Sequence, residues 1–208
     1  MVLDSYRGEA DRILSPAAKR LSKINPNHLS VASLVFALLA GVFFATEPLH
    51  FLIIAAVLVA LNGLFDALDG KVARLSAKES KRGDFVDHVI DRYADVSIVC
   101  GIFLGGYLRA DLGALALAGV LLASYLGTQA QAVGVGRVYS GVMGRADRMI
   151  VFTLATCVNL VYPAKIGAYG LEFPVLGWAL LLIGALSHVT ALQRIWYTRK
   201  MLLEDGKK

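Results

Sequence analysis

Two pairs of aspartates with helical spacing lie in the segment DALDGKVARLSAKESKRGDFVDHVIDRYAD, which runs from Asp66 to Asp95. Asp66 and Asp69 are three residues apart, and Asp87 and Asp91 are four apart, so on helices each pair projects from a single face. If the two faces meet, the four carboxylates repel one another strongly unless divalent cations such as Mg²⁺ or Mn²⁺ lie between them. The spacing therefore predicts a divalent-metal site.

Small residues and an arginine accompany these acids. Gly70 and Gly83 lack a Cβ, which lets a ligand approach the backbone closely, and Ala73 is small. Arg74 offers a planar cation suited to phosphate. Together these residues predict a site for a pyrophosphate-bearing substrate, in which metal neutralises charge on the leaving group. The plain alternative is a solvated charged loop held by ion pairs.

The composition indicates an integral membrane protein. Hydrophobic residues make up 57% of the chain and the mean hydropathy is +0.61, whereas ordinary soluble domains are roughly 45 to 50% apolar. Six apolar runs are each long enough to form most of a membrane span: 31–46, 49–65, 93–108, 111–130, 149–163 and 173–193. Polar flanks such as LNGLFDALDG can extend these helices and carry the aspartates with them. We expect an all-α fold in a single domain, 1–208, with a bundle of six transmembrane helices in residues 25–200.

The first residues, 1–24, predict an amphipathic helix that lies at the membrane interface. Their apolar side chains are expected on one side, and the basic ones are expected to face lipid headgroups. The apolar side would hold Leu3, Ile13, Leu14, Ala17 and Leu21, and the headgroup side Arg7, Arg12, Lys19 and Arg20.

Positive charges predict the orientation. If all six runs span the membrane, every Lys and Arg except Arg109 and Lys165 lies on one side. The positive-inside rule then places both termini and the aspartate segment in the cytoplasm. The net charge of +5 suits anionic headgroups. No RNA- or DNA-binding motif is present in the sequence, so we expect no nucleic-acid partner.

The acid-rich segment resembles a known family signature. The string Asp66-x2-Asp69-Gly70-x2-Ala73-Arg74-x8-Gly83-x3-Asp87-x3-Asp91 is similar to that of the CDP-alcohol phosphotransferases at all eight fixed positions. Members of that family have six transmembrane helices preceded by a short interfacial helix, and the resemblance implies a homodimer in the plasma membrane. It also implies transfer of a substituted phosphate from a CDP-linked lipid, CDP-diacylglycerol or CDP-archaeol, to an alcohol with release of CMP.

The resemblance also implies roles for individual residues. Asp66, Asp69, Asp87 and Asp91 would bind a two-metal centre of Mg²⁺ or Mn²⁺, and Asp91 would also be the base that activates the acceptor hydroxyl. Contacts to the CDP group would come from Asp69, Gly70, Ala73, Arg74 and Gly83. Asp84 and Asp95 lie outside the signature, and we interpret them as helix-end or ion-pair residues.

The second half of the chain bears on the acceptor. SYLGTQAQAVG, GRADRM and LQRIW are similar to the run of motifs in members that make phosphatidylinositol phosphate and its archaeal-lipid counterpart. On that resemblance Arg137, Arg148 and Arg194 would bind the phosphate of inositol phosphate. Gln129 and Gln131 stand where charged residues are expected, and glycerol 3-phosphate or serine remains an alternative acceptor.

Two other classes of protein remain open on the residues alone. Acids in a six-span protein can form the proton or cation pathway of a transporter. Such a pathway needs ionisable groups deep in several spans, yet runs 31–46 and 149–163 contain no Asp, Glu, Lys or Arg. A structural membrane adaptor, the second alternative, predicts neither metal dependence nor nucleotide binding.

Overall fold

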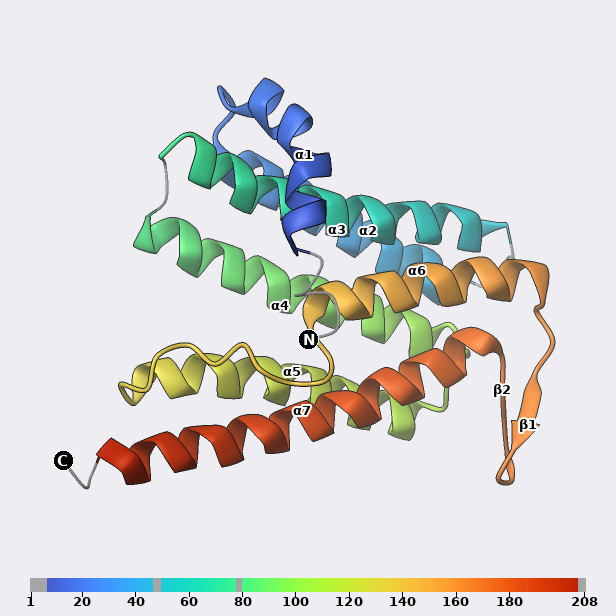
Figure 1. Cartoon of the computed structure of the whole chain (residues 1–208). Coiled ribbons are helices and arrows are strands. Elements are labelled where there is room, and N and C mark those ends of the chain that lie inside the picture. Colours follow the sequence, from blue (N-terminus) through green and yellow to red (C-terminus); the bar gives the residue numbers. More distant parts are fainter. Residues whose placement is uncertain (1–6, 47–49, 78–79, 206–208) are drawn as a thin grey trace.

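The computed structural model describes residues 7–46, 50–77 and 80–205, and these residues are almost entirely helical. They form, in chain order, α1 (Arg7–Leu21), α2 (Pro26–Ala45), α3 (Phe51–Leu75), α4 (Lys81–Leu104), α5 (Ala110–Ala132), α6 (Arg145–Val161), β1 (Ile166–Ala168), β2 (Leu171–Phe173) and α7 (Val175–Asp205) (Figure 1). The predicted all-α class is confirmed.

Local signals set the helix ends that position the aspartates. The side chain of Ser80 accepts a hydrogen bond from the Gly83 amide at 3.0 Å and caps the start of α4. Asn25 caps α2 in the same way, and Pro26 follows in the first turn, where a missing N–H costs nothing. As the LNGLFDALDG flank predicted, α3 continues past its apolar run to Leu75.

Small residues let the helices pack closely. α2 packs against both α3 and α4, α5 pairs with α7, and α6 packs against α3 and α7. A Cβ on Gly101 of α4 would lie 2.3 Å from the Gly41 carbonyl oxygen on α2, so these two backbones touch. Gly184 of α7 approaches Ala116 of α5 equally closely. Close contact between small residues is typical of helix pairs in membranes.

In the described part of the chain, four helices are long and apolar enough to cross a membrane: α2, α3, α5 and α7, the last over Val175–Glu204. Their outward faces carry exposed apolar side chains, as contact with lipid requires; examples are Val42, Ile53, Leu122 and Leu192. The chain is therefore a multi-pass membrane protein. α4 is charged in its first half and α6 has 17 residues, so spans by these two helices stay a prediction.

The segment 133–144 brings α6 into the middle of the bundle. After α5 the chain runs back along that helix before α6 begins, as the yellow segment in Figure 1 shows. The amide of Val138 donates to the Gly127 carbonyl of α5 at 3.2 Å. Gly134, Gly136 and Gly141 have positive φ, which glycine adopts without strain. As a result, the first residues of α6 lie deep in the molecule.

Two features differ from the sequence-based prediction. A two-stranded antiparallel hairpin, β1–β2, connects α6 to α7, where only a connection was predicted. α1 docks on α3 through Leu14, Ala18 and Leu21, which pack against Leu29, Leu68 and Val72.

Docking on α3 divides the predicted apolar side chains of α1. Leu14 and Leu21 pack against the bundle, whereas Ile13, at 78%, and Ala17 are exposed, so the interfacial position of α1 stays a prediction. Leu3 and the Arg7 side chain lie outside what the structure describes.

Candidate active site

The two predicted acid pairs meet across α3 and α4. Carboxylate oxygens of Asp66, Asp69 and Asp87 lie within 4.8 Å of one another, and so do single ligand atoms of Asp87, His88 and Asp91. Because Asp87 belongs to both groups, the groups form one continuous cluster. The structure thus brings together the four predicted metal ligands and adds His88, which the signature does not include.

The carboxylate cluster suits a divalent cation. Asp69 Oδ2 is buried and has no hydrogen-bond partner among the described residues. A buried polar atom without a partner costs about 1–3 kcal/mol, so such an atom calls for a ligand. Mg²⁺ and Mn²⁺ prefer carboxylate oxygens. The donor set therefore fits the predicted Mg²⁺ or Mn²⁺ centre.

The residues predicted to contact CDP lie beside these acids. Gly70 and Ala73 are half-buried on α3, and Arg74 is exposed in the last turn of that helix. A Cβ on Gly70 would meet only Arg74 Nη1, at 3.6 Å, so packing within the chain does not require glycine at this position. Gly83 lies in the first turn of α4. The backbone at Gly70 is therefore open to a ligand.

Arg145, the first residue of α6, reaches the acid cluster from a third helix. Its Nη1 forms an ion pair with Asp66 and lies 2.9 Å from Asp91 Oδ1, and its Nε lies 3.9 Å from Asp95 Oδ1. The Arg145 side chain is 13% exposed. The family resemblance implied no ligand role for Arg145, and the depth at which α6 begins cannot be read from the GRADR motif.

Arg148, one of the predicted acceptor ligands, is buried against Asp95. Its Nη2 donates to Asp95 Oδ2 at 2.7 Å, and Arg92 Nη1 lies 3.5 Å from the same oxygen. The Nε of Arg148 is buried without a hydrogen-bond partner among the described residues. Asp95 is thus an ion-pair residue, as predicted, and Arg148 joins α6 to α4 while keeping one N–H group for a ligand.

Arg194 ties the segment 133–144 to the bundle. Its Nη1 donates to the Ala123 carbonyl at 2.5 Å, its Nε to the Ser140 carbonyl at 2.9 Å and its Nη2 to the Tyr139 carbonyl at 3.4 Å. Three of its nitrogens are therefore engaged with backbone. The structure gives Arg194 a scaffolding role in addition to the predicted ligand role.

Arg137 lies in that segment and faces α4. Its Nη1 is 3.5 Å from Asp84 Oδ1, its Nη2 is 3.3 Å from His88 Nδ1, and its guanidinium carbon stands 4.8 Å from the centre of the Tyr139 ring. Asp84 lies in the first turn of α4 and forms ion pairs, as predicted. The Arg137 side chain is 27% exposed, the most accessible of the three predicted acceptor arginines.

The three predicted acceptor arginines share one region. Arg194 experiences the positive charges of Arg148, Arg137 and Arg92, so these four guanidinium groups lie within electrostatic reach of one another. They come from α4, the segment 133–144, α6 and α7. A basic group of this kind beside a carboxylate cluster suits a second, anionic ligand.

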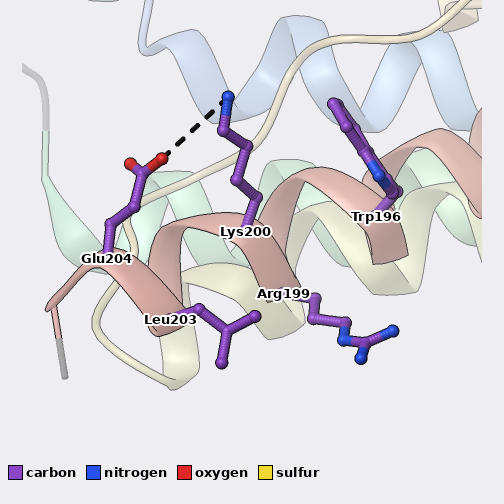
Figure 2. Close-up of a pocket in the computed structure, with 5 residues that line it drawn as sticks. All are labelled: Trp196, Arg199, Lys200, Leu203 and Glu204. Atoms are coloured by element: carbon purple, nitrogen blue, oxygen red, sulfur yellow. Dashed lines mark ion pairs between the residues drawn. The ribbon is translucent and has the colours of Figure 1, made fainter. Parts of the chain in front are cut away.

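Two cavities lie away from the acid cluster. One, of about 320 Å³, is formed by the C-terminal part of α7, where Figure 2 shows Trp196, Arg199 and Lys200 with Lys200 paired to Glu204. The other, of about 510 Å³, lies between the α4–α5 turn and the hairpin. None of the predicted site residues lines either cavity.

The fold and the site together define a class of protein: a helical membrane enzyme with a carboxylate metal centre. The sequence pattern of the CDP-alcohol phosphatidyltransferase family matches residues 23–189, and the chain belongs to that family. Family membership and the acid cluster confirm the prediction of a metal-dependent CDP-alcohol phosphotransferase.

Several characterised proteins resemble the chain over nearly its full length. It is 34% identical to the archaetidylinositol phosphate synthase of Pyrococcus horikoshii, over 97% of this chain and 98% of that protein. It is 26% identical to the phosphatidylinositol phosphate synthase of Cutibacterium acnes, over 96% of this chain and 98% of that one.

Solved structures share the fold. The phosphatidylinositol phosphate synthase of Mycobacterium tuberculosis with CDP-DAG bound gives a TM-score of 0.72 at 23% identity and covers 90% of this chain and 94% of that one. The same protein in complex with manganese and citrate gives 0.68, also at 23% identity, over 89% of this chain and 88% of that one.

Proposed function

We propose that this enzyme transfers a lipid phosphate group from a CDP-linked lipid to the hydroxyl of inositol phosphate and releases CMP. The observation that carries the proposal is the convergence of two acid pairs on α3 and α4 beside a group of arginines from three other segments. Relatives named as inositol phosphate lipid synthases support this choice of acceptor. The donor is CDP-diacylglycerol or CDP-archaeol.

The donor half of the reaction belongs to α3 and the start of α4. Asp66, Asp69, Asp87 and Asp91 would hold two divalent cations, which would neutralise charge on the donor phosphates and make the attacked phosphorus more electrophilic. Asp69, Gly70, Ala73, Arg74 and Gly83 bind the CDP group. The open backbone at Gly70 admits the nucleotide, and Arg74 supplies a fork of donors to a phosphate.

The acceptor half depends on Asp91 as base. Its carboxylate takes the proton of the acceptor hydroxyl as that oxygen attacks the lipid-side phosphorus of the donor. The new phosphorus–oxygen bond forms as the phosphoanhydride bond breaks, and CMP carries away the electron pair. Arg145, whose Nη1 lies 2.9 Å from Asp91 Oδ1, pairs with this base before the reaction.

Arg137, Arg148 and Arg194 bind the phosphate of the acceptor. Arg137 is the most accessible, Arg148 keeps its Nε free of a hydrogen-bond partner among the described residues, and Arg194 holds the segment that carries Arg137. Charge-assisted bonds from guanidinium groups suit a phosphate monoester. Glycerol 3-phosphate, which also carries a phosphate, is the second candidate acceptor.

We further propose that all six helices from α2 to α7 cross the plasma membrane, with α1 at the interface and both termini in the cytoplasm. Positive charge supports this orientation, because Lys and Arg gather at one end of the bundle and only Arg109 and Lys165 lie at the other. The whole chain then forms one domain, and two chains form a homodimer.

CMP release tests the acceptor directly. Purified protein receives a CDP-lipid, Mg²⁺ or Mn²⁺, and in turn inositol phosphate, free inositol, glycerol 3-phosphate or serine. The proposal predicts fast CMP release with inositol phosphate and little with free inositol or serine. Equal release with free inositol or serine would contradict it, and release with glycerol 3-phosphate alone would favour the second candidate.

A further inference from the structure

Arg145 directly joins the two acid pairs. The guanidinium contacts Asp66 from the α3 pair and Asp91 from the α4 pair. Its side chain is 13% exposed, so water screens these contacts weakly. α6 begins at this residue, and packing of α6 against α3 keeps the guanidinium in place.

A role in helix packing does not explain this placement. Three residues further along α6, Arg148 already joins α6 to α4 through Asp95 at 2.7 Å. Arg145 lies 3.9 Å from Asp95, beyond hydrogen-bond distance, and turns towards Asp66 and Asp91. None of its three guanidinium nitrogens makes a hydrogen bond of good geometry with the described residues, although they are buried. The positive charge of Arg145, more than any hydrogen bond that it donates, therefore determines its effect on the two carboxylates.

We propose that Arg145 is a fixed third cation of the acid cluster, which holds Asp66 and Asp91 together and weakens divalent-metal binding. The guanidinium shares oxygens with any metal ion that takes these two carboxylates as ligands, and like charges at such distances repel. If Arg145 only positioned Asp66 and Asp91 and did not compete with the metal for their oxygens, it would strengthen metal binding, since outer contacts that orient ligands usually raise metal affinity. The two roles therefore predict changes of opposite sign.

Arg145 would benefit the reaction through the net charge of the site and through the rate at which metal ions exchange. With Arg145 in place, the site keeps one positive charge more than its metal ions supply, which suits a substrate that brings several phosphate charges. Weaker metal binding also lets the ions exchange more readily. The inference rests on the metal part of the proposed function and not on the acceptor.

Mn²⁺ binding to the full chain tests the proposal without substrate. The detergent-purified protein is stripped with chelator and titrated with Mn²⁺, and the free ion is followed by electron paramagnetic resonance. Arg145→Gln should bind Mn²⁺ about tenfold more tightly than the native protein, whereas Arg145→Lys, which keeps the charge, should bind it nearly as the native protein does. Equal or weaker binding by Arg145→Gln would overturn the proposal.

Thermal unfolding gives a second readout, which remains usable if Arg145→Gln folds poorly without metal. Without metal, this variant should unfold at a lower temperature than the native protein, because Asp66 and Asp91 then repel each other. With added Mn²⁺ it should regain stability at lower concentrations than the native protein needs. A variant that needs more Mn²⁺ than the native protein would overturn the proposal.

Arg109→Gln is the matched control. It removes the guanidinium of Arg109, which lies between α4 and α5 and pairs with Asp111 away from the acid cluster. The substitution should leave Mn²⁺ affinity unchanged. An equal tightening in this control would overturn the proposal, since any lost positive charge would then have the same effect. If the native chain binds no Mn²⁺, the metal site itself is wrong and the inference falls with it. A lack of specificity for inositol phosphate would instead contradict only the proposed identity of the acceptor.

Discussion

Asp91 combines two tasks that substitution can separate. It lies in the acid cluster as a predicted ligand, and it is the predicted base for the acceptor hydroxyl. Replacing it with Asn keeps the shape and one oxygen but removes the ability to accept a proton. We expect Asp91→Asn to lower kcat by about 10²- to 10⁴-fold while CDP-lipid binding falls much less.

Single-turnover kinetics and equilibrium binding of the CDP-lipid measure the two effects separately. Asp84→Asn is a suitable control, because Asp84 pairs with His88 and Arg137 outside the signature and should keep donor binding near the native value. Equal losses of binding and rate in Asp91→Asn would mean that Asp91 is chiefly a metal ligand.

Substitutions of the acceptor arginines should differ in their effects on the KM for inositol phosphate and on stability. Arg137→Ala should raise the KM for inositol phosphate roughly tenfold to a hundredfold with little change in stability, because one charge-assisted hydrogen bond contributes about 1.5–3 kcal/mol. Arg194→Ala should raise the same KM and also lower the unfolding temperature, since it frees three backbone carbonyls.

Initial rates at varied acceptor concentration and thermal unfolding distinguish these outcomes. Arg148→Ala should raise the KM as well, with a loss of stability caused by the unpaired, buried Asp95. Affinity for the CDP-lipid serves as the control and should stay nearly constant in all three variants. If the KM for inositol phosphate does not move, the arginines only orient the protein in the membrane.

At the scale of helices, contact between α2 and α4 holds the acid pair of α4 at its depth. Gly101→Ala should destabilise this contact by about 1–3 kcal/mol, because the added methyl group would lie 2.3 Å from the Gly41 carbonyl oxygen and backbone cannot give way cheaply. Thermal unfolding in detergent measures the effect. The free energy of unfolding should fall even though no site residue has changed.

Gly63→Ala is the matched control on α3. Its Cβ would meet nothing closer than Met149 Cβ at 3.6 Å, an ordinary contact. In a helix interior, Ala is more favourable than Gly by about 0.5–1 kcal/mol, so Gly63→Ala should be neutral or stabilising. Equal destabilisation by the two substitutions would show that helix propensity, and not the close contact with α2, decides the result.

For the whole molecule, the orientation predicts which sites a membrane-impermeant thiol reagent reaches. With Cys100 and Cys157 replaced by Ala, Tyr169→Cys at the tip of the hairpin should react in intact cells, since the Tyr169 side chain is fully exposed. Glu204→Cys near the end of α7 should react only after the cells are permeabilised. The opposite pattern would reverse the orientation and place the acid cluster outside the cytoplasm.

The sequence predicted those parts of the molecule that depend on local patterns. Helical spacing identified Asp66, Asp69, Asp87 and Asp91, and the structure places them together. The sequence could not show that α6 begins deep in the bundle, because this depth depends on how the segment 133–144 folds back on α5. For that reason the contacts of Arg145 with Asp66 and Asp91 were not predicted.

Tertiary contacts also decided features that the sequence pattern did not predict. The docking of α1 on α3 through Ala18, Leu14 and Leu21 arises only in the folded chain. The hairpin β1–β2 is too short for its alternation to stand out from a loop. Arg194 was predicted as a ligand of the acceptor phosphate, and its three bonds to backbone carbonyls arise only in the folded chain.

The most direct test of the proposed activity is to identify the lipid that the enzyme makes. Purified protein, a CDP-lipid, inositol phosphate and Mg²⁺ or Mn²⁺ are incubated together, and the lipid product is analysed by mass spectrometry, with Asp91→Asn and excess chelator as controls. The proposed activity should yield a lipid with two phosphates per molecule, one a diester to inositol and one a monoester on the ring, and no product in either control. A product with a single phosphate from free inositol or serine, or full turnover in excess chelator, would contradict it.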